Sequence, residues 1–185
     1  NGDCVLLPSF ICNELIPIFL IRGIKYRFYN ITENFDPNFK DIQRNIQNDT
    51  RAILSINYFG FSRKNKELKN LCDSNKIFLI EDNAIYYGNY KNVSGKKIFS
   101  GSFGDYSLNS FNIMKNISSL FGGAVSSQDK NFIKYCREEN TKMKNRYLPL
   151  LPPPLPLRTS MTCVPQLRMS NTVLDIRLFQ APLHL

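Results

Sequence analysis

Three side chains in the middle of the chain have the types and order that carbonyl–amine chemistry requires. Lys115 lies in a polar stretch, Ser110 stands five residues before it, and Asp82 follows the apolar run 77–80. A lysine amine can form a Schiff base with an aldehyde. A carboxylate can keep a pyridine nitrogen protonated so that the ring accepts electrons, and a hydroxyl can bind a phosphate. These are the groups that pyridoxal phosphate needs from a protein.

Each of these residues alone has a simpler interpretation. Most lysines lie on the surface, most carboxylates after a strand are exposed, and most loop serines cap turns. The apolar residues Ile113, Met114 and Ile117 surround Lys115, and we expect them to shield its amine from water. Without further motifs around it, Lys115 would be interpreted as a surface lysine, so the case for a cofactor site depends on the motifs that surround these three residues.

Five short motifs lie in register along the first two thirds of the chain. They are Pro8-Ser9-Phe10, Asn57-Tyr58-Phe59-Gly60, Glu81-Asp82-Asn83-Ala84, Gly101-Ser102-Phe103-Gly104-Asp105, and Ser110 followed by Lys115-Asn116 and Gly122-Gly123-Ala124. In this order and at nearly this spacing, they resemble the DegT/DnrJ/EryC1/StrS family of sugar aminotransferases, which have pyridoxal phosphate fold type I. The resemblance covers about residues 2–140.

The resemblance implies a role for four residues and a class of reaction. Lys115 matches the lysine that forms the Schiff base, Asp82 the acid at the ring nitrogen, and Ser110 the serine at the phosphate. Ala84 matches a small residue packed beneath the ring. Family members transfer an amino group from an amino acid to a keto sugar, usually nucleotide-linked, and are typically homodimers. Some sugar dehydratases of the family carry histidine in place of the lysine, so Lys115 favours transamination.

The sequence also departs from the family pattern. Ile85 stands where many members have glutamine, Ile11-Cys12 where many have an aromatic ring that stacks on the cofactor, and Asn57 where histidine is usual. Full members also have helices and a phosphate-binding loop before the equivalent of Gly2, and a small C-terminal domain. We therefore expect a partial large domain that binds the cofactor weakly or not at all in isolation. Another fold-type-I enzyme, an inactive remnant and a basic, non-catalytic binding module are the alternatives.

Apolar runs and helical patterns alternate along the chain with short connections. We expect strands at 4–7, 25–29, 52–56, 77–80, 105–109 and 122–127, helices at 13–22, 37–48 and 64–74, a hairpin within 86–99, and a last helix, capped by Ser127 or Asp129, that ends near Lys144. Asp36 is expected to cap the helix that begins at Pro37. This βαβ pattern predicts an α/β fold, a mainly parallel sheet flanked by helices. Such sheets bind ligands at the carboxyl ends of their strands, where Glu81-Asp82 is expected.

Charge, hydropathy and cysteine content favour a cytoplasmic protein without a metal. The net charge is +9, but the lysines are spread out, so a solvated surface is favoured over a nucleic-acid site. No apolar run approaches the roughly 18 residues of a transmembrane helix, and the N-terminus is unlike a signal peptide. The five cysteines are scattered, which favours buried free thiols over disulfides or zinc: Cys4, Cys12, Cys72, Cys136 and Cys163.

Composition changes sharply after Tyr147. Seven of the ten prolines lie in residues 148–185, which contain no lysine. We therefore predict two parts: residues 1–147 as the partial cofactor-binding domain, and residues 148–185 as a disordered or foreign tail. The Pro/Leu run could be a polyproline ligand, and an out-of-frame end of a gene is the favoured alternative.

Overall fold

A six-stranded sheet forms the centre of the computed structural model, which describes residues 2–62, 64–119 and 122–147. The strands are β1 (Cys4–Pro8), β2 (Lys25–Tyr29), β3 (Thr50–Ile56), β4 (Phe78–Asn83), β7 (Tyr106–Ser110) and β8 (Gly123–Ser127). Their order is β2-β1-β3-β4-β7-β8, and only β8 runs antiparallel to its neighbour. The predicted mainly parallel α/β fold is therefore confirmed.

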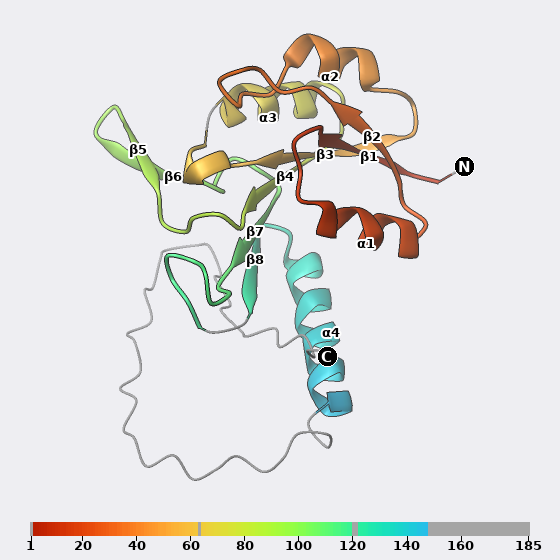
Figure 1. Ribbon diagram of the computed structural model, residues 1–185, viewed down its shortest axis with the longest axis vertical. Helices are drawn as coiled ribbons and strands as arrows, with labels where there is room; N and C mark the ends of the chain where they lie inside the picture. The colour runs from red at the N-terminus through yellow and green to blue at the C-terminus, as the bar shows by residue number, and fades with distance from the viewer. Residues whose placement is uncertain (1, 63, 120–121, 148–185) are drawn as a thin grey trace.

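In the described part of the chain, four α-helices flank this sheet. They are α1 (Ile16–Ile21), which follows a 3₁₀ turn at Asn13–Leu15, α2 (Phe39–Asn45), α3 (Asn65–Ser74) and α4 (Lys130–Tyr147). Figure 1 shows α2 and α3 together on one side of the sheet and α1 on the other, with α4 beside β8. Helices on both faces explain why the central strands β1 and β3 are mostly apolar with little alternation in burial.

The main core lies between the sheet and the α2/α3 layer. Its strand and helix side chains are nearly or fully inaccessible to water: Leu6, Tyr29, Ile42, Ile53, Leu68, Cys72, Ile77 and Leu79. The one polar atom that Tyr29 brings into this core is satisfied, since its hydroxyl donates to the Leu54 carbonyl at 2.8 Å. Burial of this size supplies most of the free energy that holds such a domain together.

The predicted start of α2 was wrong by two residues. Asn38, not Asp36, caps the helix: its side chain accepts from the Asp41 backbone N–H at 3.2 Å. Pro37 instead pairs with Ile31 in an isolated bridge. The helix also ends at Asn45, because Ile46 has an extended backbone. Asp129 is confirmed as the cap of α4, accepting from two backbone N–H groups.

The predicted end of β4 was wrong in a way that matters for the site. The strand continues through Glu81, Asp82 and Asn83 instead of stopping at Ile80. Both neighbours keep it in the ladder, since Asp82 lies opposite Ile56 of β3 and Leu108 of β7. The predicted hairpin is confirmed as β5 (Tyr90–Val93) and β6 (Lys96–Phe99). The predicted tail 148–185 lies outside the described residues.

Candidate functional site

The candidate site lies at the carboxyl end of β4. Successive side chains of a strand point to opposite faces of the sheet. Leu79 belongs to the core under α3, so Glu81 shares that face and Asp82 lies on the other. The acidic pair of the sequence is therefore divided between two environments.

Asp82 is a half-buried carboxylate with three identified influences on its pKa. One oxygen accepts from the Ala84 backbone N–H at 2.7 Å. Burial raises the pKa of Asp82 from its ordinary value, and the Ala84 hydrogen bond and the Lys115 charge act in the opposite direction. The Lys115 charge therefore acts on the Asp82 carboxylate, although the two residues are 33 positions apart in the chain.

Lys115 lies in the loop that joins β7 to β8, and it is half-buried. Its backbone N–H donates to the Asn112 carbonyl at 3.0 Å. The next residue, Asn116, fixes the loop from outside: its side chain accepts from the Tyr87 N–H at 2.9 Å and donates to the Tyr87 carbonyl at 2.8 Å. This paired contact holds the Lys115 loop against the segment that follows Asp82. Nothing in the sequence indicated this contact of Asn116, apart from its place next to Lys115.

The expected apolar shield around Lys115 was wrong. Ile113 is 62% exposed, Met114 91% and Ile117 50%. Among the described residues of this loop Phe111 is buried, and its ring packs edge-on against Tyr87. The loop is therefore held by Phe111 and Asn116, and its apolar tip points outward.

Ser110 and Ala84 lie next to the same strand ends. Ser110 is the last residue of β7, and its hydroxyl is 3.5 Å from the Asn112 backbone N–H. Gly123 lies opposite it on β8, where an added Cβ would be 2.5 Å from the Asn109 carbonyl oxygen. Ala84 directly follows β4 and is half-buried. The contacts of Ser110 with phosphate and of Ala84 with a cofactor ring stay predictions.

Glu81 has a structural role that the sequence did not reveal. Its side chain is fully buried. Its two carboxylate oxygens accept five hydrogen bonds, from Asn57, Asn65, Gly101, Phe103 and Gly104. We call these six residues the Glu81 network. A carboxylate held in this way is stable in the interior because donors replace its water shell.

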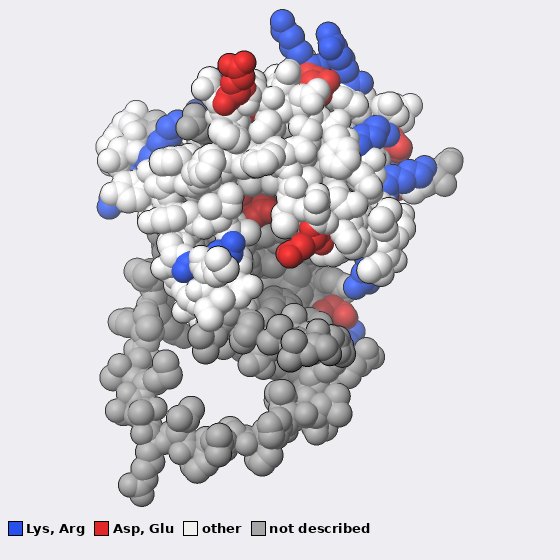
Figure 2. Space-filling view, in the orientation of Figure 1, with Lys and Arg blue, Asp and Glu red and all other residues white. Residues whose placement is uncertain are grey.

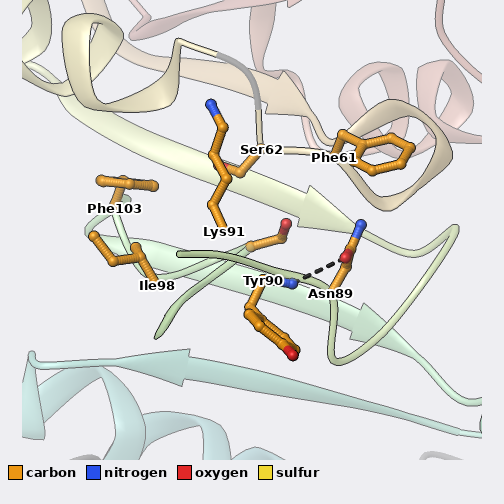
Figure 3. A pocket seen from close by; sticks show the side chains of 8 residues that line it. Phe61, Ser62, Asn89, Tyr90, Lys91, Ile98 and Phe103 are labelled. Carbon is orange, nitrogen blue, oxygen red and sulfur yellow. Dashed lines mark hydrogen bonds between the residues drawn. The ribbon is translucent and has the colours of Figure 1, made fainter. Parts of the chain in front are cut away.

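A small pocket lies on the outer side of the Glu81 network. The β5–β6 hairpin and the segment after β3 enclose a volume of about 210 Å³, lined by Phe61, Tyr90, Lys91, Ile98 and Phe103 among others. Figure 3 shows the rings of Phe61 and Phe103 on opposite sides of the Lys91 side chain, which extends between them. Phe103 joins pocket and network, because its backbone N–H donates to Glu81 at 2.7 Å.

Figure 2 shows lysine and arginine scattered over the visible face without a continuous patch. Among the described residues, no three histidine, cysteine or acidic side chains come together as metal ligands. In the same part of the chain, no helix combines the length and apolarity needed to cross a bilayer. Cys4 and Cys72 are buried free thiols as predicted, but Cys12 is exposed.

Comparison with known protein families identifies the family of this chain. Residues 1–147 match the model of the DegT/DnrJ/EryC1/StrS aminotransferase family. The chain belongs to this family. The sugar-aminotransferase resemblance is thereby confirmed, and the DegT/DnrJ/EryC1/StrS match spans both Asp82 and Lys115.

Curated relatives of this DegT/DnrJ/EryC1/StrS chain are named as nucleotide-sugar enzymes. GDP-perosamine synthase of Vibrio cholerae is 33% identical over 137 residues, which are 74% of this chain and 36% of that protein. UDP-4-amino-4,6-dideoxy-N-acetyl-beta-L-altrosamine transaminase of Campylobacter jejuni is 36% identical over 118 residues, covering 62% of this chain and 30% of that protein. The chain therefore spans about a third of the length of these relatives.

Solved structures of the family share the fold. The Helicobacter pylori aminotransferase PseC matches with a TM-score of 0.62 at 23% identity, over 71% of this chain and 34% of that one. An Escherichia coli GDP-4-keto-6-deoxy-D-mannose-3-dehydratase, solved with hydrated PLP, matches with a TM-score of 0.60 at 21% identity, over 70% and 33%. The fold is thus that of part of a fold-type-I large domain.

The three family departures lie in different surroundings. Ile85 is 42% exposed just beyond Asp82, and Cys12 is exposed after β1. Asn57 is buried, and its side chain donates to Glu81 at 3.1 Å and also to Asn83. Asn57, which stands where histidine is usual in the family, therefore belongs to the buried Glu81 network.

Proposed function

We propose that this chain is the cofactor-binding part of a pyridoxal-phosphate-dependent aminotransferase. The whole protein would transfer an amino group from an amino acid to a nucleotide-linked keto sugar, in the cytoplasm and for polysaccharide synthesis, and would act as a homodimer. The names of the curated relatives support the nucleotide-sugar class. Because the chain spans about a third of those relatives, the activity is proposed for the whole protein.

One observation carries this proposal. The Lys115 charge acts on the Asp82 carboxylate at the carboxyl end of a parallel strand, where ligands of such sheets bind. The donor set fits the cofactor: an amine, a carboxylate and a hydroxyl lie on the ends of β4 and β7 and on the loop after β7. The Asn116–Tyr87 contact keeps the loop of Lys115 beside the residues that follow Asp82.

Each residue has a distinct part in the proposal. Pyridoxal phosphate, when bound, supplies an aldehyde for amines and a ring that accepts electrons. Lys115 would offer its amine to the aldehyde and later carry a proton. Asp82 would hold the proton of the ring nitrogen, Ser110 would donate its hydroxyl to the phosphate, and Ala84 would leave room for the ring.

Covalent labelling tests the proposal in the chain as it exists. Pyridoxal phosphate is added, the absorbance of a lysine Schiff base is recorded, borohydride fixes the adduct, and peptide mapping locates it. We expect the label on Lys115 and its loss in Lys115→Arg, which keeps the charge but has no nucleophilic amine. Asp82→Ala should weaken the absorbance.

Lys97 provides the matched control. Its ammonium lies over the Tyr90 ring on the hairpin, and its charge is not among the influences on the pKa of Asp82. Lys97→Arg should therefore leave the Lys115 label unchanged. A label scattered over surface lysines, or no label at all, would contradict cofactor binding by this chain and favour a non-catalytic remnant.

A further inference from the structure

Glu81 cannot take part in chemistry directly, because its side chain is fully inaccessible to water. It nevertheless neighbours Asp82 on β4, and its five hydrogen bonds reach two separate segments. One segment follows β3 and the other precedes β7. These are the two strands that flank Asp82.

The first segment is held through two asparagine side chains. One Glu81 oxygen accepts from Asn57 at 3.1 Å and from Asn65, at the start of α3, at 2.7 Å. Asn65 also donates to the Asn57 side-chain oxygen at 2.8 Å. The Asn57 backbone N–H in turn donates to the Asp82 carbonyl at 2.9 Å. Glu81 therefore fixes the residue that binds the Asp82 backbone.

The second segment is held through backbone N–H groups. The two Glu81 oxygens accept from Gly101 at 3.1 Å, from Phe103 at 2.7 Å and from Gly104. The chain comes this close because the glycines carry no side chain: an added Cβ at Gly104 would be 3.0 Å from the Glu81 Cγ, and one at Gly101 would overlap Asn83. This segment leads directly into β7, which ends at Ser110.

Asp82 depends on both flanking strands for its position. It lies opposite Ile56 of β3 and Leu108 of β7. If either strand end moves outward, water can enter beside the carboxylate. The Glu81 network links the segments beside both strands on the opposite face of the sheet.

We propose that Glu81 is a positioning residue for Asp82. Its network holds the end of β3 and the segment that leads into β7 in place on either side of the Asp82 carboxylate. The purpose of this arrangement rests on the proposed function, but the arrangement itself is a property of the chain without cofactor. The proposal therefore predicts a change at Asp82 that can be measured with no cofactor present.

The test is an NMR titration of the Asp82 carboxyl carbon in the whole chain, assigned with Asp82→Asn. In Glu81→Gln, the amide would face donors with its own NH₂ group, so the network opens. We expect the pKa of Asp82 to fall toward its ordinary value of 3.8, because water reaches the carboxylate. The two titratable groups that interact with Asp82, Lys115 and Tyr58, are unchanged in this variant.

Two further variants separate positioning from loss of charge and from loss of stability. Asn65→Ala keeps the Glu81 charge, removes one donor and should shift Asp82 in the same direction by a smaller amount; it also serves if Glu81→Gln does not fold. Ile42→Ala destabilises the core elsewhere and should leave the titration unchanged. An unchanged Asp82 titration in folded Glu81→Gln or Asn65→Ala would overturn the proposal.

The outcome is independent of the labelling of Lys115. A shifted Asp82 titration together with an unlabelled Lys115 would support the positioning role and contradict the proposed function. A labelled Lys115 together with an unshifted Asp82 would do the reverse.

Discussion

Two adjacent carboxylates on β4 have opposite surroundings. Glu81 is fully buried beneath the α3 side of the sheet and accepts five hydrogen bonds. Asp82 is half-buried on the other side, accepts from Ala84 and interacts with the charge of Lys115. Glu81 links neighbouring segments of the fold, and Asp82 is the residue for which we propose a role in cofactor binding.

This difference shows what alternation along a strand does to an acidic pair. In a loop, Glu81 and Asp82 could have lain together as two acids of one site. Inside β4 they cannot, because neighbouring side chains point to opposite faces. The strand's extra length therefore assigns the two roles: the residue that shares a face with Leu79 is buried, and the residue beside it faces the edge where Lys115 lies.

Stability should differ most between these two positions. Glu81→Leu removes the acceptor of five buried donors, and we expect the free energy of unfolding to fall by about 3–5 kcal/mol. Asp82→Asn keeps an oxygen for the Ala84 N–H and should change it by less than about 1 kcal/mol. Urea unfolding followed by circular dichroism measures both. Equal losses in the two variants would mean that the two faces are not distinct.

The fold was largely predictable because its signals are local. Apolar runs marked β1, β2 and β3 within two residues, and the βαβ alternation fixed the parallel sheet. The start of α2 was missed because Asp36-Pro37 has the ideal composition for a helix start, whereas the bridge between Ile31 and Pro37 is a contact that the local pattern does not reveal.

The sequence could propose the members of the candidate site but not the contacts that support them. Lys115, Asp82 and Ser110 were named from motif order and residue type, and their roles stay predictions. The burial of Glu81 and the clamp by Asn116 depend on residues 20 or more positions away, at Gly101 and at Tyr87. Gly101 and Tyr87 lie in loops without a sequence signal of their own, and they contact Glu81 and Asn116 because β4 and β7 are neighbours in the sheet.

The same contrast extends to apolar residues on the two sides. Leu79 is fully buried beside Glu81, and Leu79→Ala should lower the free energy of unfolding by about 2–4 kcal/mol through the cavity it leaves. Ile113 is exposed in the Lys115 loop, and Ile113→Ala should change it by less than about 0.5 kcal/mol. Urea unfolding of both variants tests this, and a loss above about 1 kcal/mol for Ile113→Ala would indicate packing of the loop tip.

The smallest effect is a pH dependence that comes from Asp82 itself. Burial raises the pKa of Asp82 above its ordinary value of 3.8, since the folded state disfavours the charged form. Below that value the group is protonated in both states and has no effect. As the pH rises, the unfolded chain loses the proton first, so the folded state loses stability until the pH passes the raised pKa.

The Asp82→Asn variant lacks this titration. The free energy of unfolding of wild type should therefore fall relative to Asp82→Asn as the pH rises through the ordinary pKa of 3.8, and the fall should end once the raised pKa is passed. A rise instead would mean that the Lys115 charge outweighs burial. Lys115→Met removes that charge and should extend the fall to higher pH, because the charge lowers the pKa of Asp82.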